Sequence, residues 1–181
     1  MSETVWNLFV ELRKELVEAQ KIRAQVMGFK VTFVSAVVGL VAANLDKLDS
    51  ALLAIPALAA ICFDFLICSY SFSVKRIGNY TRKYIEPVLK KSSDLPEDFL
   101  MWQEFLTQPK TRQRLSLYGN LGFTMLVSGL ALIALWSSPR PVLSYVLTAA
   151  IAVFFVMDIM AHREHRRLGK IWVNRNIELE H

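Results

Sequence analysis

Four segments of this chain are apolar, almost free of charged residues and close in length to a membrane-spanning helix. The hydrocarbon core of a bilayer is about 30 Å thick, and a helix that rises about 1.5 Å per residue crosses it in roughly 20 residues. The segments cover residues 28–45, 51–74, 115–136 and 142–161. We therefore expect an all-α, polytopic membrane protein with four transmembrane helices in a single domain over residues 1–178.

Two joints between these spans, residues 46–50 and 137–141, are very short. Helices joined by so few residues pack as antiparallel pairs, so the sequence predicts two helical hairpins. No secretory signal pattern precedes the first span, so we expect that span to remain in the protein. Residues 179–181 resemble the remnant of a purification tag and are set aside.

The basic residues are distributed unequally along the chain. Of 21 Lys and Arg residues, only Lys47 and Arg140 lie in the short joints. The other nineteen lie before or at the start of the first span, in the central segment 75–114, or after the fourth span. Because cytoplasmic segments carry the excess of Lys and Arg, we expect both termini and the central segment in the cytoplasm, and the spans in a bacterial inner membrane. Lys30, at the start of the first span, is expected to extend its amine to the cytoplasmic surface.

Residues 1–27 are predicted to form an amphipathic cytoplasmic helix that leads directly into the first span. Apolar residues recur there at alternating steps of four and three, which is the period of a coiled-coil seam. One interpretation is an oligomerisation helix, and the other is a helix that packs on its own cytoplasmic segments or on the membrane surface. The seam residues are Val5, Phe9, Leu12, Leu16 and Ala19.

The second span is predicted to continue as a helix beyond residue 74 until Pro87 bends or ends it. An aromatic helical face is expected at residues 97–108, still within the central segment 75–114. Basic clusters in that segment and in the tail, residues 162–178, are candidates for contact with acidic phospholipid, or with a nucleotide or nucleic-acid signal. They comprise Lys75, Arg76, Arg82, Lys83, Arg166 and Arg167.

Asp64 is the most informative polar residue inside a span. It lies ten residues before Lys75, on the order of 15 Å from that boundary. An ionisable group at that depth costs on the order of 2.5–3.5 kcal/mol, so it should face protein or water. In the third span a polar stripe repeats every four residues and could face Asp64: Ser116, Asn120, Thr124 and Ser128.

Two interpretations of this stripe remain open. In the first, the stripe and Asp64 line a water path shared between subunits. In the second, Asn120 or a serine hydrogen-bonds a protonated Asp64 inside a sealed bundle.

A stripe of small residues in the first span suits close helix packing. It consists of Gly28, Thr32, Ser35 and Gly39. A weak internal repeat is also visible, because Gly28-Phe29 and Gly122-Phe123, like Asp64 and Asp158, are separated by 94 residues. Both hairpins enter from the same side, so a repeat would be related by an axis along the membrane normal.

Asp158, His162 and His165 share one face of the fourth helix. Three ligands on a single helix rarely surround one ion, so we expect an interfacial ion-pair network rather than a metal site. No glycine-serine elbow, HExxH, Walker loop or CxxC motif is present, so enzyme activity and a cofactor are not expected.

Four spans in a chain of this length are too small to enclose a wide path alone. A homo-oligomeric channel or pore is therefore the leading hypothesis. The layout is similar in architecture to the small multi-span effectors of bacterial stress and antiphage systems, and that similarity implies a signal-gated path that depolarises the membrane. The alternatives are a non-conducting anchor that recruits a cytosolic protein, and a proton-coupled small carrier that uses Asp64.

Overall fold

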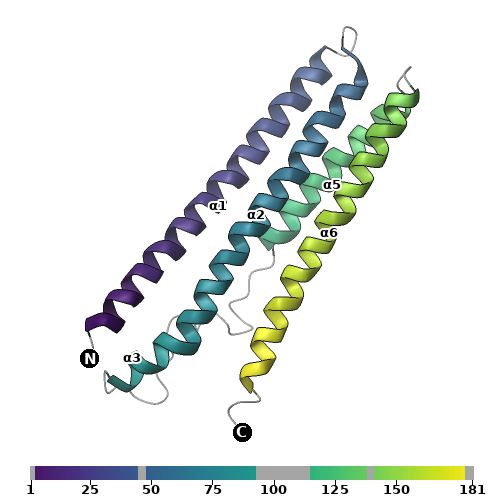
Figure 1. The fold of residues 1–181 in the computed structure, drawn as a ribbon. Helices are drawn as coiled ribbons and strands as arrows, with labels where there is room; N and C mark the ends of the chain where they lie inside the picture. The colour runs from purple at the N-terminus through teal and green to yellow at the C-terminus, as the bar shows by residue number, and fades with distance from the viewer. Residues whose placement is uncertain (1–2, 45–47, 93–114, 138–140, 178–181) are drawn as a thin grey trace. The chain divides into compact units, whose positions relative to one another are not determined.

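The computed structural model describes residues 3–44, 48–92, 115–137 and 141–177, and this part of the chain is 97% helical and contains no strand. Four helices are long and apolar enough to cross a membrane, as the sequence predicts. The elements in chain order are α1 (Glu3–Ala43), η1 (Ser50–Leu53), α2 (Ala54–Tyr80), η2 (Thr81–Ile85), α3 (Glu86–Ser92), α5 (Leu115–Trp136) and α6 (Pro141–Ile177) (Figure 1).

Helices α1 and α6 each run without interruption from an apolar segment into a charged one. Helix α1 joins the predicted cytoplasmic helix to the first span in 41 residues. Helix α6 carries the fourth span on through the basic tail in 37 residues. The prediction that residues 1–27 continue directly into the first span is therefore confirmed.

The second long helical segment contains two irregular stretches, a 3-10 turn at its start and a π turn before Pro87. Near its start, Asp49 accepts a hydrogen bond from the amide of Ala51 at 2.9 Å and caps the short 3-10 turn η1. Pro56 follows in the first turn of α2, where its missing amide hydrogen is not needed.

Pro87 is accommodated by η2, a π-helical turn. The amide of Glu86 donates to the carbonyl of Thr81, five residues earlier instead of four. Single π turns of this kind absorb an interruption of the helical hydrogen-bond ladder. The helix predicted to bend or end at Pro87 therefore continues as α3 to Ser92. The aromatic face predicted at residues 97–108 lies outside the described residues.

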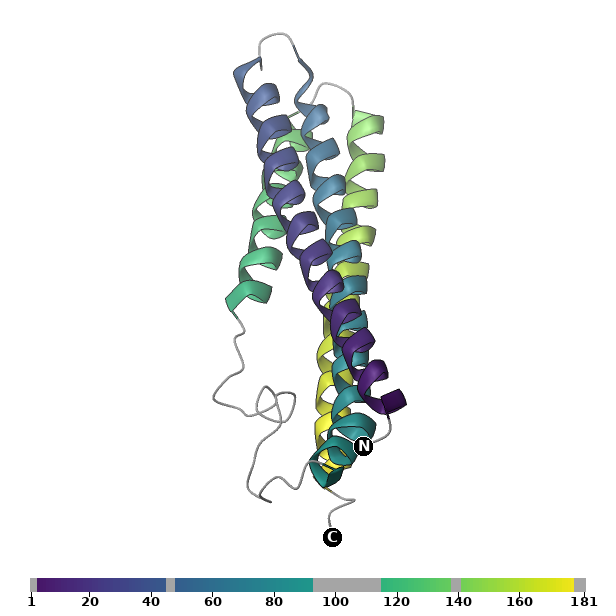
Figure 2. The same ribbon diagram turned by 90° about the vertical axis from the view of Figure 1, so that its left-hand side faces the viewer.

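The chain divides into two compact units. The first, here called the apolar unit, contains Ala24–Cys68 and Arg114–Glu164. The second, here called the amphipathic unit, contains Met1–Arg23, Ser69–Gln113 and His165–His181. Within the apolar unit, parts of α1, α2, α5 and α6 run alongside one another (Figures 1 and 2).

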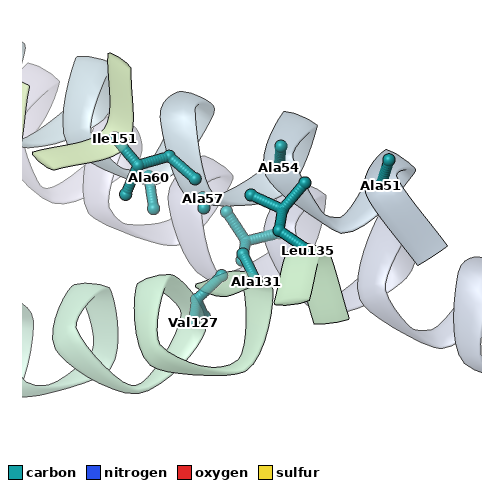
Figure 3. Close-up of a cluster of buried hydrophobic side chains, with 9 residues drawn as sticks. Ala51, Ala54, Ala57, Ala60, Val127, Ala131, Leu135 and Ile151 are labelled. Atoms are coloured by element: carbon teal, nitrogen blue, oxygen red, sulfur yellow. The ribbon is translucent and has the colours of Figure 1, made fainter. Parts of the chain in front are cut away.

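Small side chains form the centre of the apolar unit. Helix α2 and the turn before it present a row of alanines, of which Ala57 and Ala60 are completely buried. Val127, Ala131 and Leu135 of α5 face this row (Figure 3). Because the side chain of alanine is a single methyl group, the row lets the backbones of α2 and α5 approach closely.

In the amphipathic unit the predicted seam of α1 is partly buried. Ala19 is 9% exposed, and the other seam side chains are intermediate between buried and exposed: Val5, Phe9, Leu12 and Leu16. This burial occurs within one chain, as the interpretation of a helix packed on its own cytoplasmic segments requires. Whether the seam also joins subunits stays a prediction.

Candidate functional site

Lys30 lies completely buried in the apolar unit, with an exposed fraction of 0%. Its ammonium nitrogen Nζ lies 2.8 Å from Asp64 Oδ1. It also lies 2.9 Å from Asn120 Oδ1, 3.1 Å from the Asn120 carbonyl oxygen and 2.6 Å from Thr124 Oγ1. Nζ therefore has four oxygen acceptors for its three hydrogens, and at least one hydrogen is shared.

Asp64 is as deeply buried as Lys30 and is also saturated with donors. Asn120 Nδ2 donates to Asp64 Oδ1, and Thr124 Oγ1 donates to Asp64 Oδ2. Both carboxylate oxygens thus accept hydrogen bonds in addition to the ion pair with Lys30. The four side chains, Lys30, Asp64, Asn120 and Thr124, are called the polar cluster below.

Three helices supply the polar cluster, and simple helical spacing explains its geometry. Lys30 comes from α1 and Asp64 from α2, while Asn120 and Thr124 lie four residues apart on one face of α5. The ring of Phe123 also contributes, because its centroid lies 5.7 Å from Lys30 Nζ and its face attracts a cation. The cluster therefore joins the two predicted hairpins through charge-assisted hydrogen bonds.

The prediction that Lys30 extends to the surface is wrong. Its side chain is instead held inside the bundle by four oxygen atoms from two other helices. One sequence signal could have found this pairing. Lys30 is the one charged residue in the first predicted span and Asp64 is the one charged residue in the second, so each is the natural partner of the other.

The residues of the polar stripe in the third span have different surroundings in the structure. Asn120 and Thr124 join the polar cluster, and Asn120 bonds Asp64 as the sealed-bundle interpretation predicts. Ser128 is buried, and its hydroxyl has no hydrogen-bond partner among the described residues. The side chain of Ser116 lies outside the described part of the chain. Whether the stripe also lines a path between subunits stays a prediction.

The small-residue stripe of the first span lies on the exposed face of α1. Gly28, Thr32, Ser35 and Gly39 are all exposed in the single chain. A side chain built at Gly28 or Gly39 would meet no other atom within 4 Å. The close packing that the stripe predicts is therefore not made within the apolar unit, where the alanine row of α2 has that role.

In place of the predicted interfacial ion-pair network, the described part of the fourth helix shows one buried contact. His162 Nδ1 lies 3.0 Å from Asp158 Oδ1, and both side chains are buried. The side chain of His165 lies outside the described residues. Across the part of the chain that is described, no three His, Cys, Asp or Glu side chains are placed to hold a metal ion.

The basic residues predicted to contact an anion or lipid are only partly described. Lys75 and Arg82 are half-buried, whereas Arg76 and Lys83 are exposed. The side chains of Arg166 and Arg167 lie outside the described residues.

No protein-family model, curated protein sequence or solved structure matches this chain.

Proposed function

We propose that this chain is a signal-gated channel of a bacterial inner membrane whose closed state is held by the Lys30–Asp64 ion pair. The observation that carries the proposal is the complete burial of that pair between α1, α2 and α5. In the proposal the four apolar helices cross the bilayer as two hairpins, and both termini and residues 75–114 lie in the cytoplasm. The unequal distribution of basic residues supports this orientation.

A buried ion pair adds little to the net stability of a fold. Replacing such a pair by well-packed apolar side chains is often neutral or stabilising, whereas removing one partner is strongly destabilising. Lys30 and Asp64 join α1 to α2, and their hydrogen bonds with Asn120 and Thr124 join both helices to α5. The bundle is therefore sensitive to a single local event, the loss of one of the two charges. This property suits a gate.

The path in this proposal lies between identical subunits, because the interior of one subunit is filled by the alanine row and the polar cluster. The proposal treats the described arrangement as the closed state. Opening would break the contacts of Lys30 with Asn120 and Thr124, and α5 would turn its polar stripe toward the shared path.

The amphipathic unit is the proposed receiver of the signal. It contains the half-buried seam of α1 and the π turn η2, and π turns occur often at functional sites. A cytosolic protein, or a nucleotide or nucleic acid held by the basic residues, is the proposed signal. Acidic phospholipids are the proposed lipid partners of the same basic residues.

A non-conducting anchor that recruits a cytosolic protein is the second candidate. It is favoured by the saturation of the polar cluster, since both oxygens of Asp64 already accept hydrogen bonds within one chain. A proton-coupled carrier based on Asp64 is less well supported, because exchange of a proton at Asp64 would first have to displace Lys30.

Ion flux through the purified full chain in vesicles of anionic lipid separates these candidates. We expect low flux for the wild type and raised flux for Lys30→Met and for Asp64→Asn, because each variant leaves one charge unpaired. The double variant Lys30→Met/Asp64→Asn should return toward the wild-type level. Lys21→Met, the same substitution at an exposed position of α1, is the matched control and should leave the flux unchanged.

Vesicles that stay impermeable with every variant would refute the channel and favour the anchor. The anchor would gain direct support if a soluble protein co-purified with the full chain and was lost when residues 76–114 were removed. Saturable uptake driven by a pH gradient would instead favour the carrier.

A further inference from the structure

Asp158 is a second completely buried acid in the apolar unit, and its surroundings differ from those of Asp64. Neither oxygen of the Asp158 carboxylate has a hydrogen bond of regular geometry among the described residues. Its close ionic contact is with His162, whose Nδ1 lies 3.0 Å from Oδ1. The same Nδ1 also lies 3.0 Å from the carbonyl oxygen of Asp158. Asp158 thus depends on an imidazole for its compensating charge.

His162 contacts this carboxylate and also lies near a thiol. It is 3% exposed, and Cys68 Sγ of α2 lies 3.7 Å from Nδ1 and 3.8 Å from Nε2. The carboxylate favours the imidazolium, and a thiol close to both ring nitrogens can accept or donate a weak hydrogen bond as the ring changes its protonation. The ring is therefore placed to gain and lose a proton without losing its contacts.

The 94-residue repeat places the two buried acids in equivalent positions of the two hairpins. Asp64 corresponds to Asp158, Lys30 to Thr124 and Cys68 to His162. Two of these pairs are in direct contact, Lys30 with Thr124 and Cys68 with His162. Contact between equivalent residues is expected close to an axis that relates two repeats, so the geometry agrees with the repeat.

The correspondence shows one consistent difference between the hairpins. The first hairpin supplies its aspartate with a lysine from the neighbouring helix, and an unperturbed lysine keeps its proton up to alkaline pH. The second hairpin has Thr124 at that position, and the basic group beside its aspartate is His162, one turn beyond Asp158 on the same helix. An unperturbed imidazole loses its proton near neutral pH, and the neighbouring Asp158 carboxylate raises the pKa of His162, so its proton is lost at more alkaline pH.

We propose that Asp158 and His162 form a proton-binding site, the titratable counterpart of the Lys30–Asp64 pair. With a proton on His162, the pair is an imidazolium and a carboxylate. Without it, a neutral imidazole lies against Asp158, and the buried carboxylate has no close cation among the described residues.

The ionisable side chains around the site come from three helices. Helix α2 contributes Cys68 and Asp64, and α1 contributes Lys30. On α6 itself the next residues, Arg163 and Glu164, are exposed. Among its described side chains, α5 contributes no ionisable group to the apolar unit.

The inference deepens the proposed function and depends on it for its physiological meaning. Loss of the proton from His162 leaves the buried Asp158 carboxylate without a close positive charge, so the closed state should be less stable at alkaline cytoplasmic pH. Flux of the wild type should therefore rise with pH, and this dependence should be lost in His162→Gln.

Nuclear magnetic resonance of the full chain in nanodiscs, with isotope-labelled histidine, tests the site directly. The chain has three histidines, and the signal of His162 is identified by its loss in His162→Gln. We expect the pH midpoint of His162 to change in Asp158→Asn and to stay the same in His165→Gln, the control. If Asp158→Asn does not fold, Asp158→Glu replaces it, since moving the carboxylate by one methylene should also change the midpoint.

An unchanged midpoint of His162 in the folded Asp158 variant overturns the inference. A changed midpoint together with impermeable vesicles at every pH leaves the proton-binding site standing and removes the channel. Flux that still depends on pH in His162→Gln removes the site from gating.

Discussion

Replacing Lys30 by methionine is the sharpest perturbation of this fold, because the side chain keeps its length and loses only its charged end. The ammonium is within bonding distance of four oxygens and fully buried. After the substitution Asp64 retains only the donors of Asn120 and Thr124. Interhelical hydrogen bonds in membrane proteins average about 0.6 kcal/mol, so these two should not compensate for the lost ion pair.

We expect Lys30→Met to lower the free energy of unfolding by about 3 kcal/mol. This is the lower end of the range for breaking a buried ion pair, and it is appropriate because two donors remain on Asp64. Asp64→Asn should cost a similar amount, since it leaves the lysine unpaired. The double variant removes both charges and should lie within about 1 kcal/mol of the wild type.

Equilibrium unfolding of the purified chain in bicelles with increasing denaturing detergent measures these differences. Lys21→Met is the matched control and should change the free energy by less than about 0.5 kcal/mol. The reasoning is refuted if Lys30→Met costs less than about 1 kcal/mol, or if the double variant costs the sum of the two single ones. Either result would mean that the ion pair contributes nothing specific to the packing of α1, α2 and α5.

Three further predictions concern the core and the orientation. Leu135→Ala, which truncates a side chain that is 1% exposed, should destabilise the fold by about 2–5 kcal/mol in the same unfolding assay. The control Ile133→Ala, at a position that is 70% exposed, should destabilise it much less. Ser128→Ala should be neutral or stabilising by up to about 1 kcal/mol, because it removes a buried hydroxyl that has no partner among the described residues, and a clear loss of stability would reveal a partner. Reporters fused at Lys90 and after residue 178 should both appear on the cytoplasmic side, and a reporter in the joint 138–140 on the opposite side, so reporters at Lys90 and the tail on opposite faces would exclude the two-hairpin topology.

The long helices could be predicted because hydrophobicity is summed over many residues. The four apolar segments, and the continuity of α1 from residue 3 into the first span, followed from patterns of 18 residues or more. The bond between Asn120 and Asp64 could also be predicted as one of two alternatives, because an acid at that depth needs a donor.

The contacts of Lys30 and the packing of the small-residue stripe could not be predicted from one span, because they depend on how the spans pack against one another. The snorkelling rule misplaces Lys30 because it considers one helix and the lipid around it, and Lys30 lies near the end of its span. The small-residue stripe predicts close packing of α1, yet α2 supplies the buried small side chains. Alanine is common in every helix, so the row from Ala51 to Ala60 gives little signal until its neighbours on α5 are known.

The alanine row also has a mechanical consequence. A face made of methyl groups has no large side chains that lock into a neighbour, so it resists sliding along the helix axis only weakly. The axial position of α2 is then set by directional contacts, and Asp64 makes three of them. Neutralising this carboxylate would remove the ion pair from these contacts, so a single proton or a single mutation at position 64 should weaken the constraint on the axial position of α2, for which the natural step is one helical turn, about 5.4 Å.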